Sequence, residues 1–86
     1  MLRIESQRIP PYPSFSLTMP NEAKFLHLSY NDWNGPELFY LADPTQFPIT
    51  VNYQIVRAGE MVMPNWQHRG SFTSQGGQTV HVFRTS

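Results

Sequence analysis

The three histidines have the widest chemical range of the side chains in this sequence, and a zinc site is the first chemistry that they suggest. Imidazole nitrogens on adjacent strands can converge on Zn²⁺. No two of them have a ligand-like local spacing, and no acidic residue stands beside any of the three (His27, His68 and His81). The chain also has no cysteine to supply a thiolate ligand. The sequence therefore predicts no metal site, and we expect the histidine rings to pack against strand neighbours.

Acid–base and nucleophilic catalysis have no matching constellation either. No serine lies in a nucleophile elbow, and no glycine-rich phosphate loop precedes a helical pattern. The carboxylates occur singly and mostly at turns, where they usually accept hydrogen bonds from backbone N–H groups (Glu5, Glu22, Asp32, Glu37, Asp43 and Glu60). The sequence thus predicts a protein that is not an enzyme and that carries no cofactor.

A β-hairpin over residues 66–84 is the strongest local signal. Two arms rich in Thr, Val and Phe flank Gly76-Gly77, and a Gly-Gly loop can take the positive φ angles of a type I′ turn. Phe72 and His81 would then share one face, and Val80 and Val82 the other. This two-residue loop predicts the facing pairs Gln75 with Gln78, Phe72 with His81, and Arg69 with Arg84.

The predicted opposition of Arg69 and Arg84 raises a question of charge. Like charges that lie opposite each other destabilise a sheet, so we expect an anion between the two arginines. One interpretation is an internal carboxylate such as Glu37 or Glu60. The other is a phosphate or carboxylate group of a ligand, which suits the planar fork of arginine.

Two tryptophans occur in turn-like settings. Trp33 stands in a cluster of turn residues, and we expect it to be an exposed contact residue. Trp66 has two interpretations, a contact residue or a cap on the end of the fold. Exposed Trp with Arg nearby is typical of protein interfaces, although Trp rings also stack on nucleobases. The predicted binding residues are Trp33, Trp66, Arg57, His68, Arg69 and Arg84.

The elements that position these residues are predicted to be short strands. Apolar and polar residues alternate over several short windows, and turn residues or prolines separate the windows. No window shows an apolar pattern of helical period and length. We therefore predict an all-β fold, a small antiparallel barrel or sandwich of six to seven strands in one domain over residues 1–86. The expected strands are residues 3–9, 14–19, 24–30, 37–42 (buried on both faces), 49–55, 66–75 and 78–84.

Composition excludes several classes of partner. Six basic and six acidic residues give a net charge of zero, whereas a nucleic-acid-binding surface or a DNA mimic needs a field of one sign. The longest apolar run, residues 38–42, is too short to cross a membrane, and the N-terminus does not resemble a signal peptide. We expect a cytoplasmic protein. Its weak charge repulsion leaves a homo-oligomer open.

The chain resembles a family of small uncharacterised proteins that are encoded mostly in bacteriophage and prophage genomes and known only as a domain of unknown function. The resemblance implies a phage origin and no established activity. Glu60 after Gly59 and the proline-rich start depart from the family pattern. The matching motifs are Tyr12-Pro13, Met19-Pro20 with Ala23-Lys24, residues 38–41 with Ala42-Asp43-Pro44, residues 53–56 with Gly59, Gly70-Ser71-Phe72, and His81-Val82-Phe83.

Three functions fit these observations. The first is a phage protein that binds and inhibits a host protein, such as a component of antiviral defence, in the host cytoplasm through an aromatic and arginine surface around Trp33, Trp66 and Arg69. The second is an oligomeric protein that sequesters a small anionic, nucleotide-like signal, with Arg57, Arg69 or Arg84 on its phosphate. The third is a minor virion or replication accessory component. Arginines that converge on a pocket would favour the sequestering protein, whereas a flat aromatic patch would favour the protein that binds a host protein.

Overall fold

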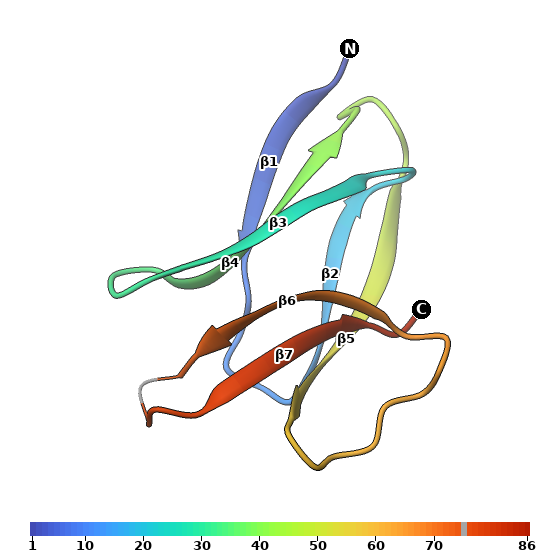
Figure 1. The fold of residues 1–86 in the computed structure, drawn as a ribbon. Coiled ribbons are helices and arrows are strands. Elements are labelled where there is room, and N and C mark those ends of the chain that lie inside the picture. The colour runs from blue at the N-terminus through green and yellow to red at the C-terminus, as the bar shows by residue number, and fades with distance from the viewer. Residues whose placement is uncertain (75) are drawn as a thin grey trace.

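The computed structural model describes residues 1–74 and 76–86, which form seven strands and no helix (Figure 1). The predicted all-β fold is confirmed. None of the described residues forms a helix long and apolar enough to cross a membrane. In chain order the strands are β1 (Arg3–Arg8), β2 (Ser14–Pro20), β3 (Lys24–Asn31), β4 (Gly35–Ala42), β5 (Pro48–Arg57), β6 (Gln67–Thr73) and β7 (Thr79–Arg84).

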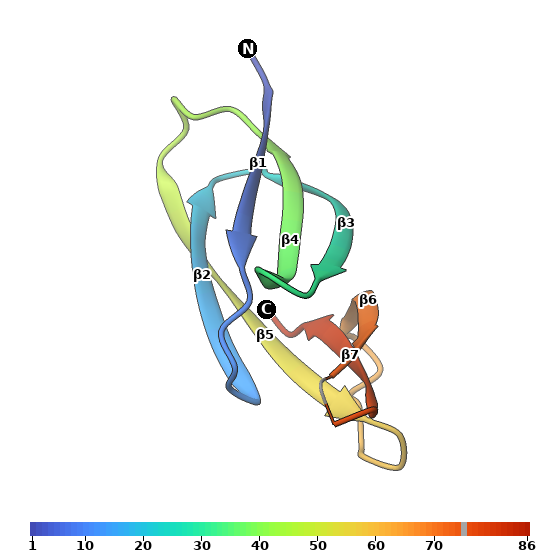
Figure 2. The ribbon, with the colours of Figure 1, turned by 90° about the vertical axis from the view of Figure 1, so that its left-hand side faces the viewer.

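The strands make two antiparallel sheets that face each other (Figure 2). One sheet has the order β1-β4-β3, and the other has the order β2-β5-β7-β6. The proline segment 10–13 carries the chain from the first sheet to the second, because prolines cannot donate to a ladder and so end β1. The core lies between the two sheets.

Alternation of apolar and polar residues selects the buried face of each strand. In β2 the side chains of Phe15, Leu17 and Met19 are buried, and the residues between them are exposed. β4 buries Leu38, Tyr40 and Ala42, but Phe39 and Leu41 on its other face are only half-buried. The expectation that residues 37–42 are buried on both faces is therefore wrong, since only one face of this sheet meets the other sheet.

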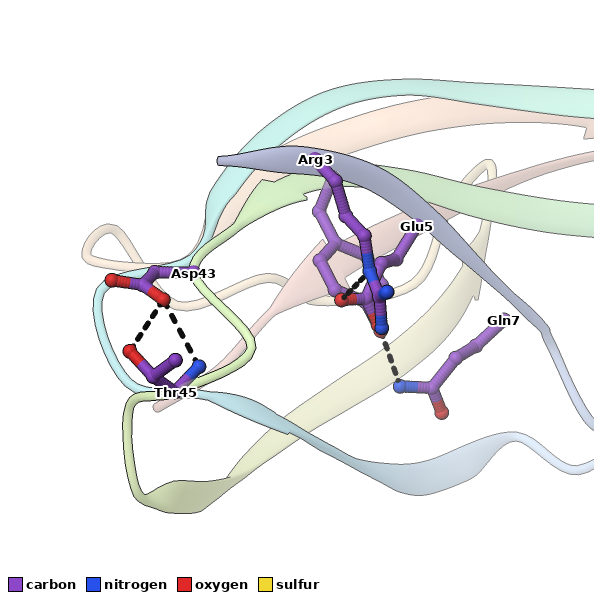
Figure 3. A network of polar contacts seen from close by, with 6 residues as sticks. Arg3, Glu5, Gln7, Asp43 and Thr45 are labelled. Carbon is purple, nitrogen blue, oxygen red and sulfur yellow. Dashed lines mark hydrogen bonds and ion pairs between the residues drawn. The ribbon is translucent and has the colours of Figure 1, made fainter. Parts of the chain in front are cut away.

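Contacts at two seams join the sheets. Gln7 of β1 donates through Nε2 to the carbonyl oxygen of Thr18 in β2 at 2.7 Å. The same Nε2 donates to the hydroxyl oxygen of Tyr40 at 2.8 Å, the bond drawn from Gln7 in Figure 3. At the other seam, β6 approaches β3 so closely that a Cβ atom at Gly70 would lie 2.7 Å from the Cβ of Leu28. These contacts hold the two sheets together at both edges of the core.

The terminal hairpin has a different loop from the predicted one. The N–H of Ser74 donates to the carbonyl oxygen of Gln78 at 2.8 Å, so three residues and not two separate this last pair. Gly77 has a φ of 81°, the left-handed conformation that commonly ends a three-residue hairpin loop. The predicted two-residue loop is wrong. Its pair of Gln75 with Gln78 lies outside the described residues.

The longer loop changes the face on which Phe72 lies. Phe72 pairs with Val80 and packs against the core, while His81 pairs with Ser71. A one-residue change of register exchanges the two faces of a strand, which is why the predicted pairing of Phe72 with His81 is wrong.

A bulge in β6 changes the surroundings of the two arginines. The register shifts between His68 and Gly70, so Arg69 has no cross-strand partner, and Arg84 pairs with Gln67. The predicted opposition of Arg69 and Arg84 is therefore wrong.

The turn between β4 and β5 contains a carboxylate with two strong donors. Asp43 Oδ1 accepts hydrogen bonds from the Thr45 hydroxyl at 2.6 Å and from the Thr45 backbone N–H at 3.0 Å (Figure 3). These two bonds hold the pKa of the exposed Asp43 carboxyl below its ordinary value. A carboxyl with a lowered folded-state pKa adds stability at neutral pH, and this stability is lost as the pH falls through the folded-state pKa.

We expect Thr45→Val to unfold at a lower temperature at pH 7 and to show a shallower loss of stability in acid. The variant lacks the hydroxyl donor, so the pKa of Asp43 moves back toward its ordinary value of about 3.9 and less stability depends on its ionisation. Thermal unfolding followed by circular dichroism from pH 7 to about pH 2 measures both effects. Thr50→Val on the exposed face of β5 is the control, and equal acid dependence in the two variants would contradict the assignment.

Candidate binding cleft

The sequence-predicted binding residues lie in three separate places. Trp33 is in the turn between β3 and β4, and Arg57 ends β5. The third place is the start of β6 and the end of β7, which hold Trp66, His68, Arg69 and Arg84. Figure 1 shows that the β3–β4 turn and the start of β6 lie on opposite sides of the molecule. Trp33 is 95% exposed, as predicted, and Trp66 is half-buried. The predicted single surface around Trp33, Trp66 and Arg69 is therefore not formed.

Aromatic rings cover the outer face of the β6–β7 hairpin. His68 packs edge-on against Phe83 with ring centroids 5.2 Å apart. The ring centroids of Trp66 and Phe83 are 6.4 Å apart. His68 Nε2 is also 3.1 Å from His81 Nδ1, a hydrogen-bonding distance. In β3, His27 stacks on Phe39 at 4.7 Å. The expectation that the histidines pack against strand neighbours is confirmed. No group of three or more metal-ligating side chains occurs among the described residues.

The two predicted carboxylate partners of the arginines lie elsewhere. Glu60 uses Oε1 to accept the backbone N–H of Arg57 at 2.6 Å, and Glu37 lies on β4 opposite Arg8 and Ser29. Among the described residues the single ion pair joins Arg3 to Glu5. The expected internal carboxylate between Arg69 and Arg84 is therefore wrong.

A cleft of about 630 Å³ opens at the end of the fold that carries the β3–β4 and β6–β7 turns. We call it the Tyr12 cleft. Four parts of the chain surround it: the proline segment 10–13, the strand residues that flank the β3–β4 turn, the end of β5 with the turn that follows it, and the β6–β7 hairpin. Its lining residues are Ile9, Pro10, Pro11, Tyr12, Pro13, Tyr30, Gly35, Pro36, Ile55, Arg57, Glu60, Phe72, Ser74 and Val80.

The walls of the Tyr12 cleft are mainly apolar and aromatic. Tyr30 and Phe72 stack across the seam between the two sheets, with ring centroids 5.6 Å apart and planes within 8°. Ile9 and Val80 are buried beside them. Tyr12 is 64% exposed at the rim, where its ring is accessible to a partner. An apolar cleft with a few polar groups is the usual form of a binding site.

A compact turn supplies the polar part of the rim. The N–H of Glu60 donates to the carbonyl oxygen of Arg57 at 3.1 Å, and the Glu60 carboxylate accepts a bond from the Arg57 N–H in return. Gly59 has a φ of 91°, which this turn requires. Arg57 itself is exposed and has no carboxylate within ion-pair distance in the described chain. Of the predicted binding residues, Arg57 is the one that lines the cleft.

The turn that carries Trp33 is held in place by side chains. Asn31 Oδ1 accepts the backbone N–H of Trp33 at 3.0 Å and that of Asn34 at 2.6 Å. Arg8 Nη2 donates to Asn34 Oδ1 at 2.8 Å and ties this turn to β1. Trp33 is thus an exposed ring on a fixed turn. Gly35 and Pro36, which follow Asn34 in the chain, line the Tyr12 cleft.

Sequence reasoning missed Tyr12, Tyr30 and Phe72. Tyr12 carries a detectable signal, because an aromatic residue between prolines is held extended and exposed. Phe72 was placed on the wrong face by the register error, and Tyr30 has no local signal because its role depends on its contact with Phe72.

Comparison with known proteins adds one match. A family model described as "Domain of unknown function (DUF7352)" covers residues 1–86. No curated protein and no solved structure gives a significant match.

Proposed function

Since the chain belongs to this family, whose function is unknown, we propose a role from the site itself: a binding module that acts by holding part of another protein in the Tyr12 cleft. The observation that carries the proposal is the cleft, which the exposed Tyr12 lines. The exposed Trp33 lies in the β3–β4 turn, close in the chain to the lining residues Gly35 and Pro36. Tyr, Trp and Arg are the residues that most often dominate the binding energy of protein interfaces.

The geometry of the cleft suits a segment of polypeptide. The apolar floor can take one or two side chains, and Arg57 at the rim can pair with a carboxylate of the partner. The rim is preorganised, because the proline segment and the Asn31 turn restrict the backbone on either side of the floor. A rigid rim loses little conformational entropy on binding, which favours affinity.

A more specific role rests on the resemblance to phage-encoded proteins. We propose that the partner is a host protein, such as a component of antiviral defence, and that binding in the host cytoplasm inhibits it. The small size of the chain and the exposed aromatic residues support a protein that works by occupying a surface of its target.

We expect a photo-crosslinking amino acid at position 12 to capture one host polypeptide, and the same amino acid at position 47 to capture none. Phe47 is a matched control because it is 63% exposed, as Tyr12 is 64%, and it does not line the cleft. The measurement is crosslinking in host cells followed by mass spectrometry of the captured protein. Equal capture from both positions would contradict binding at the cleft.

A second function is favoured by the volume of the cleft. About 630 Å³ lies within the range of small-molecule sites, and the stacked Tyr30 and Phe72 with Arg57 at the rim could hold an aromatic anion such as a nucleotide. The protein would then sequester that ligand. Native mass spectrometry of the gently purified protein separates the two functions, because a sequestering protein retains a small mass and a protein-binding module retains a polypeptide.

A further inference from the structure

A second site, away from the Tyr12 cleft, involves the start of β6 and the end of β7. These two strand ends lie together in Figure 1, on the side of the hairpin opposite its turn. We propose that Arg69 and Arg84 form a binding site there for a small oxyanion of the phosphate class. This inference is independent of the proposed function, because neither arginine lines the Tyr12 cleft.

The position of Arg84 is unusual for a charged residue. Val80, Val82 and Arg84 alternate along β7, and the two valines are buried, so Arg84 continues the row that faces the other sheet. Its cross-strand partners are Gln67 in β6 and the buried Tyr53 in β5. A cation that faces an interior needs a compensating group.

The β6 bulge brings a second cation to the same region. Arg69 is half-buried, and its guanidinium carbon lies 4.9 Å from the centre of the Phe25 ring on β3. Its Nη2 donates to Gln67 Oε1 at 2.7 Å, and Gln67 is the residue that pairs with Arg84. The two arginines are thus held next to each other although they are not cross-strand partners.

No Asp or Glu side chain forms an ion pair with either of these two arginines. All six Asp and Glu residues lie in the described part of the chain, where the single ion pair is the one between Arg3 and Glu5. Burial, followed by repulsion from Arg84, lowers the pKa of the Arg69 guanidinium. Burial raises the pKa of Tyr53, and the positive charges of Arg84 and Arg69 act against this rise. Burial is the main cause of both pKa shifts, and the smaller effects of the arginine charges on each group are those of a positive potential.

The site has space and free donors for an anion. A polar cavity of about 340 Å³ is lined by Asn65, Gln67, Arg84, Thr85 and Ser86. Arg69 does not line this cavity itself, but it is bonded to Gln67, which does. Arg84 uses Nε to donate to the backbone oxygen of Ser86 at 2.7 Å, which leaves its terminal nitrogens without a protein acceptor in the described structure. Planar guanidinium forks and side-chain amides recognise phosphate oxygens, and two adjacent arginines suit an anion of more than one charge.

Calorimetric titration and thermal unfolding with inorganic phosphate test the proposal, at an ionic strength held constant with sodium chloride. We expect phosphate to bind saturably and to raise the unfolding temperature of the wild type, whereas chloride does not. Arg84→Gln should weaken phosphate binding by about tenfold or more. Arg3→Gln, which removes an exposed cation on β1 that lines neither cavity, should bind phosphate as the wild type does.

Further measurements distinguish the source of the phosphate and guard against misfolding. If adenosine monophosphate binds only as tightly as inorganic phosphate, the site recognises the phosphate group alone. If adenosine monophosphate binds more tightly, the site recognises a nucleotide. In phosphate-free buffer, Arg84→Gln should unfold at the same temperature as the wild type or higher, because the variant lacks the repulsion between Arg69 and Arg84. Absence of saturable phosphate binding, or unchanged binding in a folded Arg84→Gln variant, would overturn the proposal.

Discussion

The Gly70→Ala variant should lose roughly 3 to 5 kcal/mol of unfolding free energy, the largest loss expected from a single added methyl group in this protein. Gly70 has a φ of 134°, which side-chain-bearing residues rarely adopt, so alanine would strain the backbone. Its Cβ would also lie 2.7 Å from Leu28 Cβ and 3.0 Å from Leu28 Cδ2, at the seam between β6 and β3. A small domain has little stability to spare, so a large fraction of the molecules should be unfolded.

Urea denaturation followed by circular dichroism measures this loss, and Gly35→Ala is the matched control. Gly35 also has a positive φ, of 69°, but a methyl group added there would meet nothing within 4 Å. We therefore expect Gly35→Ala to lose only about 1 to 2 kcal/mol. The contribution of the steric clash to this loss of stability is tested by combining Leu28→Ala with Gly70→Ala. The double variant should be less destabilised than the sum of its single changes. Equal losses at positions 35 and 70 would show that the seam is not tightly packed.

The second large effect is expected on binding. Tyr12→Ser should weaken the interaction with the crosslinked partner by about 2 kcal/mol or more, roughly a thirtyfold increase in Kd. Tyr12 is exposed at the rim of the cleft and has no side-chain hydrogen bond in the described structure, so its loss removes contact area with the partner. The same exposure predicts a change in folding stability within about 0.5 kcal/mol.

Isothermal titration calorimetry with the purified partner measures the change in affinity. Phe47→Ser removes an equally exposed ring from a position outside the cleft, and this control should leave the Kd unchanged. Thermal unfolding of both variants verifies that they are folded. If Phe47→Ser weakens binding as much as Tyr12→Ser, the partner occupies a different surface, and the cleft is not the site of protein binding.

The strands and their buried faces follow largely from the sequence. In β2 and β5, apolar residues recur at every second position, and the structure buries Phe15, Leu17, Val51 and Tyr53. This pattern is local, because a strand with one face on the core needs only the alternation of its own side chains. The all-β fold and the positions of the seven strands could therefore be predicted.

Strand register depends on the loop and on a bulge. Gly76-Gly77 is compatible with loops of two or three residues, and only the pairing of Ser74 with Gln78 selects between them. The bulge around Arg69 lies where β6 closely approaches Leu28, a residue far away in the sequence. A one-residue difference in the loop pairs Phe72 with Val80 and not with the predicted His81, and the bulge separates Arg69 from Arg84.

The class of fold and the absence of a local catalytic motif can be read from the order of the residues, because both depend on residue types at short spacing. The Tyr12 cleft exists only once the chain has folded. Its lining comes from segments that are distant in the chain, including Ile9, Tyr30, Arg57 and Phe72, and no short-range pattern links them. They meet because two sheets of fixed register stack on each other, so that their loops converge at one end.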